Sequence, residues 1–260
     1  AMRMRLVSQR ARMQSIAGAL RDIVERAGAS DASQGNVLFG ANSSSRVNKV
    51  QWAAAEAGVE YEQAAHPTSD LKLREDYLQL NPKGTVPTWV ECNNAIPFVL
   101  NESNTIVAHL AETGGGAFNA HGDHRMRSLA WQWQEYGETT LQPSLSPVWW
   151  GYKYGSGYPL GPGSALVSLD KGKLEASVQK AIKAWAAVDA HLADGRLFML
   201  GDELTFGDMT CGVHVNRLFQ MGAGGPEDKF VHLRHVRAWY HRLLKRPHYV
   251  DLVVAPTLLA

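Results

Sequence analysis

The chain is poor in cysteine: Cys92 and Cys211 are the only two among its 260 residues. Because they lie far apart in the sequence, no disulfide framework is expected, and a reducing compartment is the default expectation. No apolar run is long enough to span a bilayer. The formal net charge is only +1, so bulk charge favours neither nucleic acid nor a membrane as a partner.

Clusters of metal ligands are also lacking. Two pairs of histidines occur, His121 with His124 and His232 with His235. Neither pair has cysteines or carboxylates nearby at the spacing that zinc sites use, so no metal site is predicted. The two cysteines are expected at a hairpin end and in a helical core, which argues against either as a nucleophile.

What the chain does contain suits a globular protein of two modest domains, with 45% hydrophobic and 20% charged residues. Residues 1–34 form an N-terminal extension, in which apolar residues at helical spacing predict an amphipathic helix followed by a linker. Several arginines precede its first acidic residue. The extension is therefore either an organellar transit peptide or a helix packed on the body or on a partner subunit, and the expected location is otherwise cytoplasmic.

The strongest functional signal is the stretch Leu-Asn-Pro-Lys-Gly-Thr-Val-Pro at residues 80–87. Asn-Pro-x-Gly is a turn sequence, and Pro87 is expected at a strand start because proline cannot donate to a sheet ladder. There it leaves the amide and carbonyl of Val86 free to pair with something else. Residues 88–92 and 95–100 predict a hairpin after this turn.

The pair Glu102-Ser103 follows the hairpin directly. Apolar residues at helical spacing come next, so the pair is expected at a helix N-terminus. Exposed amides and the helix dipole favour an anionic group at such a position.

This combination resembles the glutathione-binding half of the cytosolic glutathione transferases. In that family the Val-Pro bond is cis, the valine amide and carbonyl pair with the glutathione backbone, and the Glu-Ser pair holds the γ-glutamyl carboxylate. The resemblance implies that glutathione is a co-substrate bound by Val86, Pro87, Glu102 and Ser103. The alternative is that these residues only build a thioredoxin-like hairpin.

The order of the predicted elements gives the fold class. Strand, helix, strand and helix precede the hairpin and the last helix, at residues 36–40, 47–57, 61–65 and 71–80. This βαβαββα order is thioredoxin-like, a mixed sheet with helices on both faces. We predict an α+β protein in which a thioredoxin-like domain precedes an all-α helical bundle, with the boundaries 35–113, a linker at 114–122, and 123–260.

Three serines, Ser43 to Ser45, stand between the first predicted strand and the first helix. Only the thiolate of glutathione attacks well, and its thiol pKa lies roughly one to two units above neutral. A hydroxyl donor at a helix N-terminus favours the thiolate, although a serine here can also be a simple N-cap. The segment from Gly40 to Val50 resembles the serine-type transferases, closest to the phi and theta classes, which implies Ser44 as the catalytic residue and its two neighbours as close alternatives.

The glycyl carboxylate of glutathione needs a cation or amide donors. Lys72 and Lys83 are the candidates, with a solvated surface charge as the alternative for each. Relatives more often place the basic or amide residue at the position held here by Thr85, so this end of the site departs from the family pattern.

The helical part contains a segment rich in aromatics, prolines and glycines at residues 144–164, predicted as an irregular loop. Tyr136, Trp149 and Trp150 are the candidates for contacting a hydrophobic substrate; the alternative for the loop is docking on its own domain or on a dimer partner. Thr205 and Asp208 have the spacing of a helix cap, which the family also carries and which implies a structural role.

The resulting expectation is a glutathione transferase, a homodimer as in the family, that activates the thiol for attack on a small hydrophobic electrophile. Thiolytic dehalogenation, peroxide reduction and ether cleavage would use the same activated thiol. A non-catalytic protein that binds glutathione and carries hydrophobic ligands is the alternative from another class.

Overall fold

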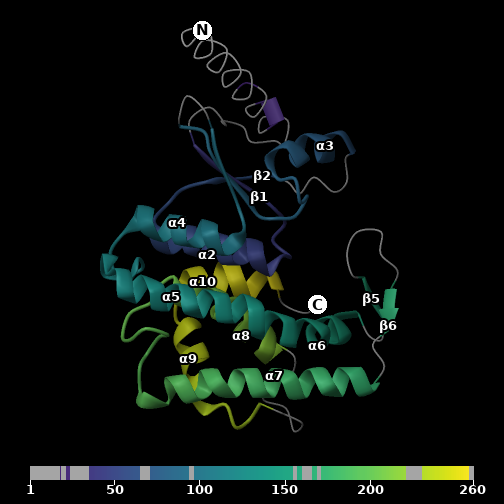
Figure 1. Cartoon of the computed structure of the whole chain (residues 1–260), viewed down its shortest axis with the longest axis vertical. Helices are drawn as coiled ribbons and strands as arrows, with labels where there is room; N and C mark the ends of the chain where they lie inside the picture. Colours follow the sequence, from purple (N-terminus) through teal and green to yellow (C-terminus); the bar gives the residue numbers. More distant parts are fainter. Residues whose placement is uncertain are drawn as a thin grey trace, which may run out of the picture. The chain divides into compact units, whose positions relative to one another are not determined.

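The computed structural model describes residues 18, 22–23, 35–64, 71–93, 97–154, 157–159, 166–168, 171–220 and 230–257. The chain divides into two units, residues 1–113 and 114–260, which are treated separately here (Figure 1). The predicted N-terminal extension lies outside the described residues, apart from Gly18, Asp22 and Ile23.

The first unit has the predicted element order. Its elements are β1 (Asn36–Phe39), α2 (Ser45–Ala57), β2 (Glu62–Ala64), α3 (Leu71–Leu80), β3 (Thr88–Glu91), β4 (Phe98–Asn101) and α4 (Ser103–Gly114). The strands form one sheet in the order β2-β1-β3-β4, in which β1 is parallel to β2 and antiparallel to β3. The predicted hairpin is the antiparallel pair β3 and β4. The thioredoxin-like βαβαββα prediction is therefore confirmed.

The sheet has a core on each face because its strand residues alternate in direction. Val37, Phe39 and Val90 pack in one cluster with Tyr77 and Leu80 of α3. Leu38 and Trp89, which alternate with these strand residues, are also fully buried and face the opposite side of the sheet. Helices α2 and α4 lie side by side on the other side of the sheet from α3 (Figure 1). The sheet is thus covered on both faces, as the sequence pattern predicted.

The second unit is mainly helical. Its longer elements are α5 (His124–Tyr136), the π-helical turn η3 (Gly137–Leu141), α6 (Gln142–Tyr154), α7 (Lys171–His191), α8 (Gly207–Gln220) and α9 (Arg234–Leu243). Its shorter ones are η2 (Ala120–Gly122), η4 (Leu192–Asp194), α10 (Pro247–Tyr249), η5 (Val250–Val254) and η6 (Ala255–Thr257). A small antiparallel ribbon, β5 (Gly157–Pro159) with β6 (Leu166–Ser168), adds a feature that the all-helical prediction did not include.

Helix α8 is the centre of this unit, buried from Gly207 to Leu218. Gly137 lets α5 and η3 approach it closely, since an added Cβ at this position would lie 2.5 Å from the Cγ2 of Thr210. Asp208 at the start of α8 accepts hydrogen bonds from the amides of Thr205 at 3.1 Å and Met199 at 2.9 Å. The predicted Thr205–Asp208 cap is therefore present.

The prediction of an irregular loop at residues 144–164 is wrong for its first half. The chain is helical through Tyr154, and Pro147 lies inside α6. Pro143 has no N–H to donate to the carbonyl four residues back, and the helix here takes the wider π register, in which the Gln142 amide donates to Gly137. The helix thus continues past both prolines.

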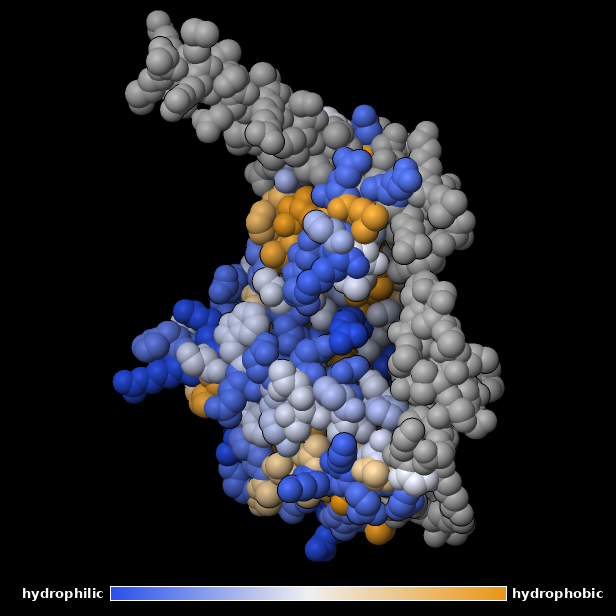
Figure 2. Space-filling model, turned by 45° about the vertical axis from the view of Figure 1, so that its right-hand side comes forward, coloured by the Kyte–Doolittle hydropathy of each residue, from blue (hydrophilic) through white to orange (hydrophobic). Residues whose placement is uncertain are grey.

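The surface presented in Figure 2 is mostly hydrophilic, with separate apolar patches. Among the described residues, none of the helices combines the length and the apolar character needed to cross a membrane. The same part of the chain contains no group of three or more metal-binding side chains.

Candidate functional site

Ser44 occupies the N-cap position of α2 with extended backbone angles, φ −90° and ψ 119°. Its carbonyl accepts the first helical hydrogen bond, from the Asn48 amide at 2.9 Å. Its half-buried hydroxyl does not cap the helix and has no hydrogen-bond partner within the described part of the chain. Ser43 lies exposed in the preceding turn, and Ser45 is buried as the first helical residue. Of the three serines, Ser44 alone is both partly buried and at the N-cap position of the helix.

A network of side-chain amides holds the loop before Ser44. Gln63 on β2 donates to the carbonyl of Gly40 and to Oδ1 of Asn42, both at 2.7 Å. Gln51 on α2 donates to the same Oδ1 of Asn42 at 3.0 Å, and Asn48 donates to the Asn42 carbonyl at 2.8 Å. Because the donors come from a strand and a helix, the loop is fixed from two directions, and Ser44 with it.

Gly40 brings the same loop against the second part of the site. It has φ +148°, and an added Cβ would lie 2.4 Å from a methyl of Val47 and 3.3 Å from the Cβ of Val86. No side chain fits at this position without displacing one of those neighbours. The loop that carries Ser44 therefore begins next to Val86.

The Val86-Pro87 peptide bond is cis, as predicted. Within the described residues, neither the amide nor the carbonyl of Val86 forms a hydrogen bond. The preceding turn is held by the Tyr77 hydroxyl at 2.6 Å and the Asn81 amide at 2.7 Å, both donating to the carbonyl of Thr85. A fixed backbone with an unpaired donor and acceptor is a site for a strand-like ligand.

Glu102 and Ser103 stand at the N-terminus of α4, as predicted. Glu102 has φ 69°, a left-handed conformation that is uncommon for residues other than glycine, and its carbonyl accepts the Ile106 amide at 3.0 Å. Ser103 is buried, with 5% of its surface exposed. Unusual backbone geometry at a helix N-terminus is typical of a binding position.

The two candidate lysines differ in what can be said of them. Lys83 forms an ion pair with Glu102, Nζ to Oε1 at 2.5 Å, with both side chains mostly exposed. It therefore lies at the Glu102 end of the candidate site. Lys72 belongs to α3, but its side chain lies outside the described residues.

Lys49 and Asn104 are two polar residues that the sequence analysis did not assign to the site. Lys49 on α2 is fully buried, and its ammonium donates to Oδ1 of Asn104, the second residue of α4. The amide network of Asn48, Gln51 and Gln63 was missed as well. One signal was available: residues 48, 49 and 51 are polar yet surrounded by the apolar stripe of α2.

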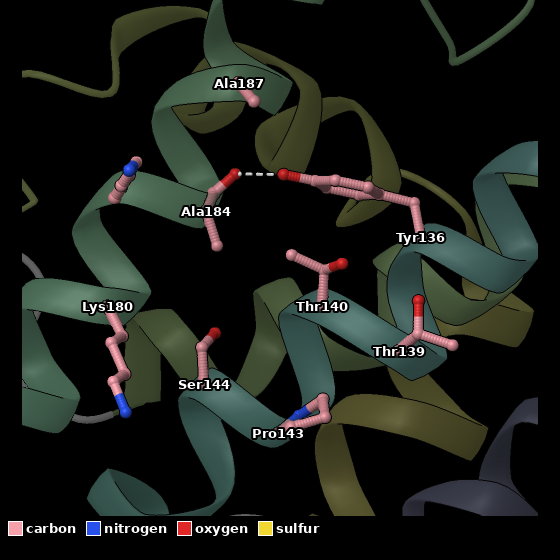
Figure 3. A pocket seen from close by; sticks show the side chains of 9 residues that line it. Tyr136, Thr139, Thr140, Pro143, Ser144, Lys180, Ala184 and Ala187 are labelled. Carbon is pink, nitrogen blue, oxygen red and sulfur yellow. Dashed lines mark hydrogen bonds between the residues drawn. The ribbon is translucent and has the colours of Figure 1, made fainter.

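The candidates in the helical unit fall at different depths. Trp149 is 2% exposed and lies under the guanidinium of Arg217, 5.1 Å from its ring centroid. Trp150 has no described side chain. Tyr136 lines a pocket of about 510 Å³ between η3, α6 and α7, with its hydroxyl donating to the Ala184 carbonyl at 2.9 Å (Figure 3). Trp149 therefore packs within its own unit, and Tyr136 alone of the three is seen to border open space.

A thioredoxin-like unit with a cis Val-Pro bond and a Glu-Ser pair at a helix N-terminus, followed by a helical unit, is the fold of the glutathione transferases. Two family models match the sequence: the glutathione S-transferase N-terminal domain at residues 43–113 and the C-terminal domain at residues 172–242. The chain belongs to the cytosolic glutathione S-transferase superfamily.

Solved structures show the same fold. A theta class glutathione S-transferase from Xanthomonas axonopodis pv. citri, with glutathione bound, is 27% identical with a TM-score of 0.69, and the match covers 86% of this chain and 99% of that one. A glutathione transferase from Burkholderia graminis, with two glutathione molecules bound per subunit, has a TM-score of 0.73 at 21% identity, over 90% of this chain and 93% of that one. A search of curated proteins finds no match.

Proposed function

We propose that the protein is a serine-type glutathione transferase in which Ser44 activates the thiol of glutathione. The observation that carries this assignment is the free hydroxyl of Ser44 at the N-terminus of α2, at the end of a loop whose first residue, Gly40, lies against Val86 with its unpaired backbone. A hydroxyl donor and the positive end of a helix both stabilise a thiolate relative to a thiol.

Glutathione would bind along Val86 as an added strand, its cysteinyl amide and carbonyl pairing with the carbonyl and amide of that residue. The α-carboxylate of its γ-glutamyl end suits the Ser103 hydroxyl and the first amides of α4. The Glu102 carboxylate suits the neighbouring α-ammonium. Lys83, already paired with Glu102, adds a cation at this same end.

The reaction then needs little further chemistry from the protein. The thiol gives its proton to solvent, and the resulting thiolate accepts a hydrogen bond from the Ser44 hydroxyl. The sulfur attacks the electrophilic carbon of the second substrate and forms a C–S bond while the leaving group departs with its electron pair. Conjugation of an aryl or alkyl halide is the default reaction, and the family resemblance extends the proposal to a homodimer in a cytoplasmic setting.

The test combines binding with turnover. We expect purified protein to bind glutathione by calorimetry and to convert at least one member of a panel of aryl halides, alkyl halides, peroxides and aryl ethers. Binding without turnover of any panel member would instead favour the non-catalytic alternative. Absence of glutathione binding would overturn the assignment.

A further inference from the structure

Ser44 stands at the N-cap position of α2 without capping the helix. An N-cap serine ordinarily accepts a hydrogen bond from the backbone amide of the second or third helical residue. Here the hydroxyl forms no such bond, and the amide of Val47, the third helical residue, has no acceptor among the described residues. Something other than the serine hydroxyl therefore holds the loop that leads into the helix.

Two buried side-chain amides on α2 contribute to holding this loop. Asn48 and Gln51 follow Ser44 by four and seven residues, so all three lie on one face of the helix. The Gln51 amide donates to Oδ1 of Asn42 at 3.0 Å and to Oε1 of Gln63 at 2.7 Å, and its own oxygen accepts from Asn48 at 3.3 Å. Gln51 is only 3% exposed, and both of its polar groups are hydrogen-bonded.

Gln63 supports the same loop from strand β2. Its amide donates at 2.7 Å both to the Gly40 carbonyl and to Oδ1 of Asn42, which thus accepts hydrogen bonds from two glutamines. Gly40 and Asn42 lie four and two residues before Ser44. The loop is therefore held by side chains of β2 and α2, and the serine hydroxyl takes no part in holding it.

This arrangement leaves two polar groups unsatisfied within the described part of the chain. One is the Val47 amide, and the other is Oδ1 of Asn48, which is buried and has no donor. A buried acceptor without a donor costs stability, whereas a serine cap would satisfy the amide with a single bond. Local departures from the most stable arrangement are expected at functional sites.

On the basis of the proposed role of Ser44, we infer that Gln51 and Gln63 are positioning residues for the reaction. They hold the loop in place of a helix cap, which leaves the Ser44 hydroxyl available to the glutathione thiol. Without them the hydroxyl turns to the Val47 amide and becomes an ordinary cap. Because one side-chain rotamer cannot serve both positions, the thiolate then loses its donor.

The first test replaces each glutamine by methionine, which has a similar length and no donor. Gln63→Met changes an exposed residue and should fold like the parent, while Gln51→Met removes the buried amide. In both variants the thiol pKa of bound glutathione should rise, as followed by thiolate absorbance. At a pH below that pKa, kcat should fall roughly three- to tenfold, which corresponds to about half to one pKa unit, and it should recover at high pH.

The second test asks whether the serine has become a cap. In the parent, Ser44→Ala should hardly change the midpoint of urea unfolding, because the hydroxyl caps nothing. In the Gln63→Met background the same substitution should lower the midpoint clearly, because a cap is then removed. A purely structural role of Gln63 would change the stability of the protein but would not make the effect of Ser44→Ala depend on residue 63.

Asn36→Ala is the matched control. Asn36 donates to the Glu60 carbonyl at 2.9 Å, so it joins the same two chain segments at the opposite end of the β1–β2 pair. This variant should leave the thiol pKa unchanged, and an equal shift in it would overturn the positioning role. If Ser44→Ala raises the thiol pKa while both glutamine variants titrate like the parent, the positioning role is wrong and the proposed function stands. If Ser44→Ala itself titrates like the parent, the proposed role of Ser44 fails, and the positioning role fails with it.

Discussion

The ammonium of Lys49 donates to the side-chain oxygen of Asn104, and this buried contact joins the two helices that carry opposite ends of the candidate glutathione site. Lys49 lies five residues after Ser44 on α2, and Asn104 directly follows Ser103 on α4. A shift between the two helices would therefore change the separation between the thiol-activating hydroxyl and the γ-glutamyl position. Fixed geometry of this kind lowers the free energy needed to align a bound ligand.

Replacing Lys49 by methionine should raise the KM for glutathione more than it lowers kcat, because the chemistry at Ser44 is unchanged while the two ends of the ligand fit less well. The variant should also lose about 1–3 kcal/mol in the free energy of unfolding, since Asn104 keeps a buried acceptor without this donor. Kinetics and denaturant unfolding measure the two effects.

Lys49→Arg keeps the charge, and its KM for glutathione should lie close to that of the parent. In a double-mutant cycle with Asn104→Ala the two losses should be clearly non-additive. Additive losses would show that the two residues act separately and would remove the coupling role.

Ser44→Ala should raise the thiol pKa of bound glutathione and reduce turnover at neutral pH, with nearly unchanged affinity. The physical reason is the loss of the Ser44 hydroxyl as a hydrogen-bond donor at the N-terminus of α2. Each pKa unit corresponds to about 1.4 kcal/mol of preference for the thiolate. The measurement is the thiolate absorbance of bound glutathione against pH. Ser43→Ala and Ser45→Ala are the matched controls, and bound glutathione should titrate in them as in the parent. If only one of these two variants shifts the titration curve, that serine and not Ser44 activates the thiol.

Glu102→Gln should weaken glutathione binding roughly tenfold, since it removes one charge-assisted contact of about 1.5 kcal/mol or more. Folding should hardly change, because the Lys83–Glu102 pair is exposed and such pairs contribute at most about 1 kcal/mol. Glu203→Gln is a fitting control: its side chain is 59% exposed, against 60% for Glu102, and it also contacts a basic side chain, that of His121. Equal glutathione affinity in the Glu102 and Glu203 variants would contradict the assignment.

Much of this architecture could be predicted from local pattern. The strands and helices of the first unit follow from residue periodicity, from the turn before Pro87 and from Gly58, which ends α2 in a left-handed conformation. All of these signals act within a few residues. The cap at Asp208 was predictable for the same reason. Such signals fix the position of a residue in its own element and say little about its neighbours in space.

What could not be predicted depends on contacts between distant segments. The buried pairing of Lys49 with Asn104 joins residues 55 positions apart, and the sequence of α2 gives no sign of its partner. The prolines at positions 143 and 147 predicted an irregular loop, yet the wider π register accommodates Pro143, and Pro147 lies inside α6. Trp149 is a candidate for contacting a hydrophobic substrate in the sequence because no packing partner for it can be predicted there; in the structure it is buried under Arg217 of α8.

Asp208 should make the stability of the protein depend on pH in an unusual direction. Its carboxyl is buried, and burial raises its pKa to about 6 even though the amides of Met199 and Thr205 and the indole of Trp239 donate to it. A folded-state pKa above the unfolded value means that the folded state binds the proton more tightly. This group's contribution is therefore fully present below about pH 4 and is lost as pH rises through about 6.

The parent should accordingly gain on the order of 2–3 kcal/mol in the free energy of unfolding from this one group between pH 7 and pH 4. Asp208→Asn cannot titrate. The variant should be less stable overall, because the NH₂ of the asparagine would face N–H groups that donate hydrogen bonds to the carboxylate in the parent. Its pH dependence should lack this gain, so the difference between the two curves, measured by urea unfolding, isolates the carboxyl. If the two curves run parallel from pH 4 to pH 7, the carboxyl titrates at its ordinary pKa, and the hydrogen bonds that it accepts outweigh its burial.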